Sequence, residues 1–312
     1  MSRRAAVSPS WSKARPALSV LIPFLRDDPS DLIDLLDEEA QSVAGAVEVI
    51  LLDDGTNDRE LTTRLQARMR AMRLPAKLIT LEVNAGRSRG RNRLAEAARG
   101  GSYLFLDSDM RPDHRRFLWT WAELVAREDP AVAFGGFSLL QAPDEPRFAV
   151  HRALSQASEC VPYAVRARTP EKYVYTSNLL VRRDVFAAEA FDAEFAGWGW
   201  EDVEWGMRVS RRHRIVHVDN PATHMGLDTV DALAGKYAQS GANFARVVER
   251  HPQIVAGYPS YRAARLLKRL PLAPRALQGL ARRLAGAAWA PVRARAFSLR
   301  LYRAAVYAEA LR

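Results

Sequence analysis

Short apolar segments and segments with helical spacing alternate through the first hundred residues, and this alternation restricts the fold more than any other feature of the sequence. The apolar segments are LSVLIP at 18–23, VEVILLDDG at 47–55, AKLITLE at 76–82 and SYLFLDSD at 102–109. The helical segments lie between them, at 31–40, 58–72 and 87–99. Strands that alternate with helices in this way form a parallel sheet with helices on both faces. The sequence therefore predicts an α/β fold.

The second half of the chain is less regular. We expect a strand over 131–140, a strand leading into a short helix over 173–186, a helix over 201–211, a strand over 214–218 and a helix over 228–250. The segment 142–170 is mixed and contains scattered prolines. Residues 1–16 are expected to be a disordered basic lead. After residue 258, the prolines at 271, 274 and 291 predict a series of short helices.

The single cysteine, Cys160, excludes a disulfide within the chain and a cluster of cysteine metal ligands. The N-terminal residues lack the apolar core of a signal peptide, and no segment approaches the roughly 18 apolar residues of a membrane span. We therefore expect a cytoplasmic protein, either fully soluble or peripheral on the inner face of the cell membrane.

Positive charge is concentrated at the C-terminal end. The net charge is +10, yet residues 261–312 hold twelve Lys and Arg and one acid, Glu309, so the other 260 residues sum to −1. This distribution argues against a basic active cleft for nucleic acid and indicates a basic appendage with its own partner. Leu277, Leu280 and Leu284 recur at helical spacing beside arginines. They fit either an amphipathic helix on an anionic membrane or helices packed on protein with their arginines outward.

Acidic residues end two of the predicted strands. Asp53 and Asp54 follow one apolar run, and Asp107 and Asp109 follow another. In parallel sheets, ligands bind beyond the carboxyl ends of the strands. Residues i and i+2 point the same way, so Asp107 and Asp109 could form a hard oxygen site for Mg²⁺ or Mn²⁺. The alternative is a solvated strand end, where Asp is a favourable turn residue.

The segment NAGRSRGRN at 84–92 opens the third predicted helix and favours an anionic ligand. Its glycines allow close approach, and arginines near a helix N-terminus oppose the helix dipole unless an anion is bound there. The alternative is an ordinary exposed helix face. Asp54, at the end of the preceding strand, could accept hydrogen bonds from a base or a ribose hydroxyl, or it could form an Asx turn with Gly55.

The segment GWGWEDVEW at 197–205 holds three of the seven tryptophans beside three carboxylates. Trp198 and Trp200 could stack on the C–H faces of a sugar ring, while Glu201 and Asp202 accept hydrogen bonds from its hydroxyls. The two glycines allow unusual dihedral angles and a hinge. The alternative for the two acids is a pair of charges at a helix N-terminus. We expect Trp205 in the core and Glu204 facing solvent.

These motifs, in this order, resemble glycosyltransferase family 2. The segments LSVLIPF, VILLDDGTND, NAGRSRGRN and YLFLDSDM carry the resemblance over about 18–112. The segments TSNLLVRRDVF, FDAEFAGWGWEDVEWGMRV and HMG resemble a subset that shares a G-W-G-x-E-D segment with galactosyltransferases and with bacterial polymerases of amino-sugar polysaccharides. The resemblance implies a GT-A fold, a Rossmann-like and mostly parallel sheet flanked by helices. The implied domain spans 17–258, with a nucleotide-binding half at 17–112, an acceptor and catalytic half at 113–258, and a basic helical tail at 259–312.

The resemblance also implies roles for individual residues. The nucleotide-sugar donor would be bound by Pro23, Asp53, Asp54, Gly86, Arg91, Asp107, Trp198 and Trp200. Mn²⁺ or Mg²⁺ would be bound by Asp109 and His224, with Asp107 near both the metal and the ribose. Asp202 would be the catalytic base, and Glu201 would help to bind sugar hydroxyls. Trp200 departs from the family pattern, because relatives often have glycine there, and its ring would narrow the sugar pocket or form part of the acceptor wall.

The implied function is metal-dependent hexosyl transfer from a nucleotide diphosphate sugar, most simply a UDP-sugar, to a saccharide or lipid-linked acceptor in polysaccharide or glycoconjugate synthesis. We expect inversion, because no second nucleophilic carboxylate is evident. A nucleotidyltransferase acting on sugar phosphates is one alternative, but it would usually have a glycine-rich loop where this chain has PFLRDDP. A non-catalytic nucleotide-sugar-binding protein is another, but it should lack part of the set Asp107, Asp109, Asp202 and His224. The tail has no nucleic-acid recognition motif, so no nucleic-acid partner is expected.

Overall fold

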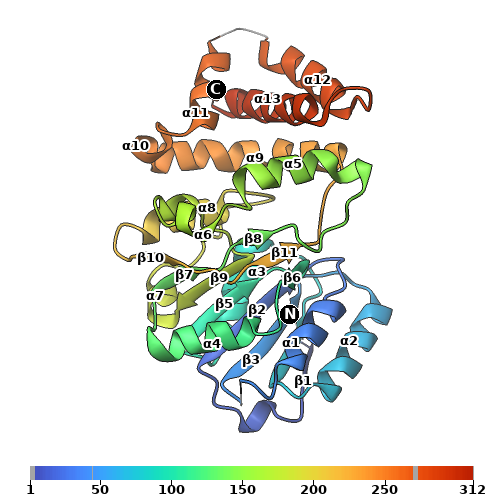
Figure 1. Ribbon diagram of the computed structural model, residues 1–312, viewed down its shortest axis with the longest axis vertical. Coiled ribbons are helices and arrows are strands. Elements are labelled where there is room, and N and C mark those ends of the chain that lie inside the picture. Colours follow the sequence, from blue (N-terminus) through green and yellow to red (C-terminus); the bar gives the residue numbers. More distant parts are fainter. Residues whose placement is uncertain (1–3, 44, 270–272, 312) are drawn as a thin grey trace.

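A central eight-stranded sheet organises the computed structural model, which describes residues 4–43, 45–269 and 273–311 (Figure 1). Its strands, in spatial order, are β1 (Arg4–Val7), β4 (Ala76–Thr80), β3 (Val47–Asp53), β2 (Leu18–Phe24), β5 (Ser102–Leu106), β9 (Asn178–Arg182), β7 (Val132–Phe134) and β10 (Ile215–His217). Strands β4, β3, β2 and β5 are parallel, and β9 is antiparallel to both of its neighbours. The predicted α/β fold with a mostly parallel sheet is confirmed.

Helices cover both faces of this sheet, as the alternation predicts. Residues of β2 point alternately into two core clusters, with Val20 and Ile22 in one and Leu21 in the other. The first cluster receives side chains from α1 (Ser30–Glu38), α2 (Arg59–Ala71) and α4 (Phe117–Arg127). The second receives side chains from α3 (Arg87–Ala97), α7 (Arg183–Ala188) and α8 (Glu201–Val209).

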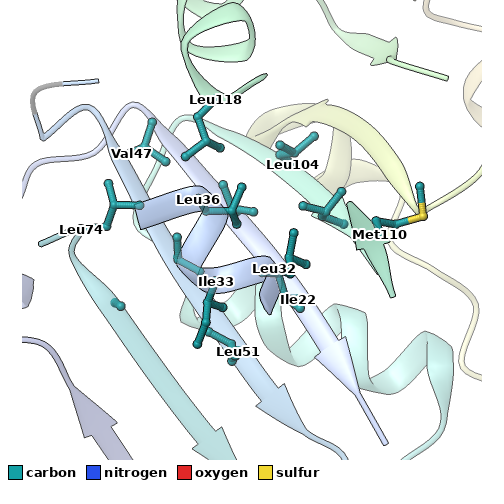
Figure 2. Packing of buried hydrophobic residues seen from close by; sticks show 14 of the residues in the cluster. Ile22, Leu32, Ile33, Leu36, Val47, Leu51, Leu74, Leu104, Met110 and Leu118 are labelled. Atoms are coloured by element: carbon teal, nitrogen blue, oxygen red, sulfur yellow. The ribbon is translucent and has the colours of Figure 1, made fainter. Parts of the chain in front are cut away.

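Helix α1 shows how one apolar stripe fixes such a contact. Leu32, Ile33 and Leu36 lie on one side of the helix and are at most 3% exposed. Figure 2 shows them above Ile22 of β2 and Leu51 of β3. Burying a side chain of this size contributes about 2 kcal/mol, so the stripe holds α1 on the sheet.

A second, three-stranded sheet contains β6 (Met110–Pro112), β11 (Ala222–His224) and β8 (Phe137–Ser138), in that order. The strand predicted over 131–140 is split between β7 and β8 at Gly135 and Gly136. Gly136 has φ +106°, and a side chain there would overlap the Arg166 guanidinium. In the small sheet, His224 pairs with Met110, the residue after Asp109. The short sheet therefore brings His224 to the edge beyond β5.

The mixed segment 142–170 contains regular structure that its prolines obscure. It holds a 3-10 turn at Pro146–Phe148, α5 (Ala149–Ser158) and α6 (Tyr163–Arg166), and a further 3-10 turn follows at Pro170–Lys172. Helix α5 buries Val150 and Leu154 at the expected spacing. These residues join a third core cluster with α9 (Val230–Arg250) and α10 (Pro252–Val255).

The expectation of a disordered lead is wrong for its described residues. Strand β1 pairs antiparallel with β4, with Val7 opposite Lys77, and a 3-10 turn follows at Trp11–Lys13. The Trp11 ring lies 3.8 Å from the Arg99 guanidinium carbon. The pairing has a physical reason, because β4 would otherwise leave a row of edge N–H and C=O groups without partners. Residues 1–3 lie outside the described part of the chain.

The tail forms α11 (Pro259–Lys268), α12 (Ala273–Gly286) and α13 (Val292–Ala310) at one end of the molecule (Figure 1, top). Helices α12 and α13 pack on α9, α13 also packs on α5, and α11 packs on α13. The break at Pro291 is confirmed, since this residue precedes α13. Pro274 lies instead near the start of α12, where proline is tolerated, and Pro271 lies outside the described residues. No helix within the described ranges is long and apolar enough to cross a membrane.

Candidate active site

The predicted site residues gather where the order of the parallel strands reverses. From β2 the chain moves outward through β3 to β4, and then returns to place β5 on the other side of β2. Such a switch point opens a crevice at the carboxyl ends of the strands. Pro23 lies near the end of β2, Asp53 ends β3, and Asp107 directly follows β5.

Asp53 and Asp54 shape the loops at this edge. Asp53 Oδ1 accepts a hydrogen bond of 2.8 Å from the Thr56 N–H. The two carboxylate oxygens of Asp54 accept from the N–H groups of Ala85 and Gly86, at 2.7 and 3.0 Å. Burial raises the pKa of Asp54 even though these hydrogen bonds oppose the rise. Asp54 therefore holds the entry to α3, where the sequence suggested a free acceptor for a base or ribose.

Arg91 is a buried cation that bridges two elements. Its side chain is 2% exposed, Nη2 donates to Asp107 Oδ1 at 2.7 Å, and Nη1 lies 3.7 Å from Glu201 Oε1. Burial opposes its charge, but the two carboxylates outweigh burial and raise the pKa of Arg91. Nε and Nη1 are buried without a hydrogen-bond partner among the described residues. The arginine segment predicted to face an anion thus directs this side chain to Asp107 and Glu201.

Asp109 and His224 form a second pair in the crevice. His224 Nε2 lies 3.1 Å from Asp109 Oδ2. Burial alone would raise the pKa of the carboxyl and lower that of the imidazole, but their mutual attraction reverses both directions. The Met225 N–H donates to the Asp109 carbonyl at 2.8 Å. A side chain at Gly226 would overlap the Asp109 carboxylate and displace it from its present position.

The Asp109–His224 pair fits a divalent cation by its donor chemistry. Carboxylate oxygen and imidazole nitrogen suit Mn²⁺, and His224 Nδ1 is buried with no hydrogen-bond partner in the part of the chain described. Asp107 does not join them, since its Oδ1 accepts from Arg91, and no three His, Cys, Asp or Glu side chains form a metal cluster within the described ranges. The structure thus brings together two of the three predicted ligands.

A cavity of about 470 Å³ opens beside Asp109. Its wall includes Asp27 and Asp28 from the segment that leads into α1 and Asp31 from the first turn of α1, together with Ser108 and Gly226. Burial, and then repulsion by Asp109, raises the pKa of Asp27. The cavity leaves room for a ligand at this edge, and its extra carboxylates were not among the predicted site residues.

The start of α8 carries the predicted catalytic acids on a constrained loop. Gly197, Gly199 and Trp200 have φ values of +74°, +88° and +78°, and only glycine adopts this region freely. Glu201 is 5% exposed. Burial, followed by repulsion from Glu201, raises the pKa of Asp202 to about 7. A carboxyl with this pKa can exchange a proton near neutral pH.

The two tryptophans of the loop pack on the helical end of the molecule. Trp200 Nε1 donates to the Tyr307 hydroxyl of α13 at 2.9 Å, and its ring contacts Phe244 of α9. Trp198 contacts Tyr237 edge to face. Both rings are half-buried, so packing accounts for part of the surface that the sequence assigned to sugar stacking.

Of the two remaining predictions for this segment, the one for Trp205 is confirmed and the one for Glu204 is wrong. Trp205 is fully buried, which confirms its place in the core. Glu204 is 1% exposed and binds Arg208 and His251, so the expectation that it faces solvent is wrong. These two partners compensate its buried charge. Sequence spacing predicts only the contact with Arg208, which lies four residues along the same helix.

Two residues that hold this loop were not predicted. Asn243 Nδ2 of α9 donates to the carbonyls of Ala196 and Gly199, both at 2.9 Å. Tyr307 accepts from Trp200 and stacks on Phe244, with ring centroids 4.1 Å apart. Asn243, a polar residue within an amphipathic helix, was only a weak indication of such a contact. Nothing in the sequence connects residue 307 with residue 200.

The comparison with known families decides the class of this site. The family model for glycosyl transferase family 2 matches residues 19–188, more than half of the chain. The chain belongs to this family. The strand edge that carries Asp53, Asp54, Asp107 and Asp109 lies within the matched residues and is therefore the candidate active site of a glycosyltransferase. No curated protein sequence matches the chain.

Solved structures support the fold of this family member. The mannosyltransferase PcManGT from Pyrobaculum calidifontis, in complex with GDP-Man and Mn²⁺, has a TM-score of 0.57 at 15% identity, covering 95% of this chain and 87% of that one. S. aureus TarS 1-349 in complex with UDP-GlcNAc has a TM-score of 0.54 at 15% identity, covering 94% and 90%. A mycobacterial protein has a TM-score of 0.51 at 20% identity, covering 77% and 76%. The likeness to PcManGT and TarS establishes the GT-A fold.

Proposed function

We propose that this glycosyltransferase moves a hexose from a UDP-sugar to a hydroxyl of a saccharide or lipid-linked acceptor, with inversion. The observation that carries the proposal is the bridge from Asp107 through the buried Arg91 to Glu201. This bridge ties the start of α8, and with it Asp202, to the strand edge that carries Asp109 and His224. The proposed base and the proposed metal ligands therefore lie on elements that Arg91 joins.

The donor would occupy the carboxyl edge of the sheet. Pro23 and Asp53 would border the base, and Asp54 would act indirectly by orienting the N–H groups of Ala85 and Gly86. Asp109 and His224 would hold Mn²⁺ or Mg²⁺, with Asp107 beside them and near the ribose. When bound, such an ion supplies positive charge that stabilises a diphosphate leaving group. TarS, which has the same fold, was solved with UDP-GlcNAc, and PcManGT was solved with GDP-Man and Mn²⁺. Both ligands support a nucleotide diphosphate sugar as the donor.

The chain's own residues would carry the proton transfer. Asp202 takes the proton of the acceptor hydroxyl while that oxygen forms a bond to the anomeric carbon. The bond from the anomeric carbon to the diphosphate oxygen breaks, and the nucleotide diphosphate leaves with the electron pair. Glu201 would bind sugar hydroxyls, and the remaining surfaces of Trp198 and Trp200 would border the sugar. The G-W-G-x-E-D resemblance favours a galactosyltransferase-like acceptor half.

Release of nucleotide diphosphate from a panel of UDP-, GDP- and TDP-sugars, with and without Mn²⁺, tests this proposal. We expect one donor to be hydrolysed slowly and only with metal, and hydrolysis to be lost in Asp109→Ala. Asp202→Asn should still bind that donor, measured by calorimetry, but should not transfer the sugar to an acceptor. Asp144→Asn, which changes a carboxylate that is 91% exposed, is a matched control and should behave as wild type.

Two results would contradict these assignments. Full transfer by Asp202→Asn would exclude this residue as the base. Donor binding that is unchanged in Asp109→Ala and insensitive to Mn²⁺ would exclude the proposed metal site.

A further inference from the structure

The turn between α12 and α13 leaves five large apolar side chains in solvent. We define the hairpin patch as Leu280, Leu284, Trp289, Val292 and Phe297. Their exposed fractions range from 36% to 82%, and Trp289 has the highest value among the exposed large apolar residues in the described part of the chain. Single exposed apolar residues are ordinary, but five within eighteen residues are not.

The patch residues lie on the last two turns of α12, in the connecting turn and on the first two turns of α13. Helices α12 and α13 pack against each other and are joined by residues 287–291 (Figure 1). Arg295 Nε donates to the Ala285 carbonyl at 2.9 Å, which ties the two helices beside the turn. Leu284 and Phe297 therefore flank the turn that carries Trp289.

The opposite side of each helix is already used for packing. Ala281 and Ala285 of α12 and Leu299 and Tyr302 of α13 are buried in the third core cluster. The patch is thus a separate surface. The interpretation in which the tail helices pack on protein is confirmed for their inner side, while the turn stays outside.

Some arginines near the patch form ion pairs within the protein, and others do not. Arg275 and Arg282 pair with Glu309 and Asp231. Arg283, Arg293 and Arg300 are exposed, and no ion pair or hydrogen bond of their side chains is present within the described ranges. The segment 273–300 contains no acidic residue. The patch therefore combines exposed rings with positive charge that the protein does not compensate.

We propose that the hairpin patch docks on an anionic lipid surface. Tryptophan and phenylalanine rings insert at the boundary between headgroups and acyl chains, while arginines contact anionic headgroups. A second copy of the patch fits poorly, because it would place arginines against arginines with no acid between them. The proposal does not depend on the transferase activity, so either can fail without the other.

Sedimentation of the purified full chain with vesicles tests the proposal. We expect binding to vesicles of 30% phosphatidylglycerol in phosphatidylcholine and little binding to pure phosphatidylcholine. Binding should weaken as the salt concentration rises from 0.05 to 0.5 M, because about 0.1 M salt screens charges beyond ~10 Å. The pair W289S/F297S and the pair R283Q/R293Q should each lower the partition coefficient at least about tenfold. L140S, which changes a side chain that is 75% exposed outside the tail, is the matched control and should bind as wild type.

Three outcomes would overturn the proposal. These are equal binding to both kinds of vesicle, an equal loss in L140S, and no binding to either vesicle. A dimer in sedimentation velocity that disappears in W289S/F297S, together with absent vesicle binding, would assign the patch to a second copy instead. Because the substituted side chains are exposed, melting temperatures should stay within a few degrees of wild type, which separates lost binding from lost folding.

Discussion

At the scale of single residues, the charge state of Asp202 governs the proposed chemistry. Burial, and next the charge of Glu201, raises its pKa to about 7. A general base must be ionised, so a raised pKa means that activity is present above about pH 7 and is lost as the pH falls through that value. We expect kcat/KM to show an ascending limb near pH 7.

Substitution of Glu201 tests whether Asp202 is the group that titrates. Glu201→Gln removes the second-largest cause of the shift, so the ascending limb should move to lower pH, measured over pH 5–9 with saturating metal. Glu60→Gln changes a carboxylate that is 85% exposed on α2 and should leave the limb in place. A limb that stays fixed in Glu201→Gln would show that another group titrates there.

At the scale of elements, the loop before α8 depends on two helices far along the chain. Trp200 adopts φ +78°, which costs a residue other than glycine about 1–3 kcal/mol. The hydrogen bonds from Asn243 and the contact with Tyr307 hold the loop in this form. Helices α9 and α13 therefore hold the loop from which α8 and its two acids begin.

Tyr307→Phe tests this positioning role. It removes the hydroxyl that binds Trp200 Nε1 but keeps the ring that stacks on Phe244. A lost hydrogen bond of this kind costs about 1 kcal/mol, so we expect kcat to fall roughly fivefold to tenfold with an unchanged KM for the donor. Tyr302→Phe, on the same helix, is the control and should keep wild-type kcat. A changed donor KM with an unchanged kcat would refute the positioning role.

The helices and strands could be predicted from the sequence better than the contacts between them. Short apolar runs located β2, β3 and β5, and acids marked the ends of β3 and β5, because buried parallel strands and their polar ends leave local signals. The first turn of α8 was likewise visible from Trp200–Asp202. The Arg91 bridge and the Trp200–Tyr307 contact were not, because they join residues far apart in the chain whose pairing depends on the packed helices. Asp54 shows the same limit, since the spacing of a strand-end acid does not reveal whether it binds a ligand or, as here, the loop before α3.

At the scale of the whole molecule, the tail is part of the folded core. The third core cluster contains residues of α5, α8 and α9 together with Leu299, Tyr302 and Val306 of α13. A basic appendage, as the charge distribution suggested, would unfold by itself and leave the rest intact. A shared cluster instead couples the tail to α9, and through Trp200 to the loop before α8.

Leu299→Ala distinguishes a coupled tail from an independent one. Leu299 is fully buried, and removing a buried leucine side chain costs about 2–5 kcal/mol. If the tail is coupled, urea unfolding should stay a single transition with that loss in the free energy of unfolding, whether it is followed by helix content or by tryptophan fluorescence. Leu280→Ala, at a position that is 56% exposed on α12, should change the free energy by less than about 0.5 kcal/mol. An early transition seen in helix content but not in tryptophan fluorescence would show that the tail unfolds alone. In that case, the contact between Tyr307 and Trp200 could not hold the catalytic loop.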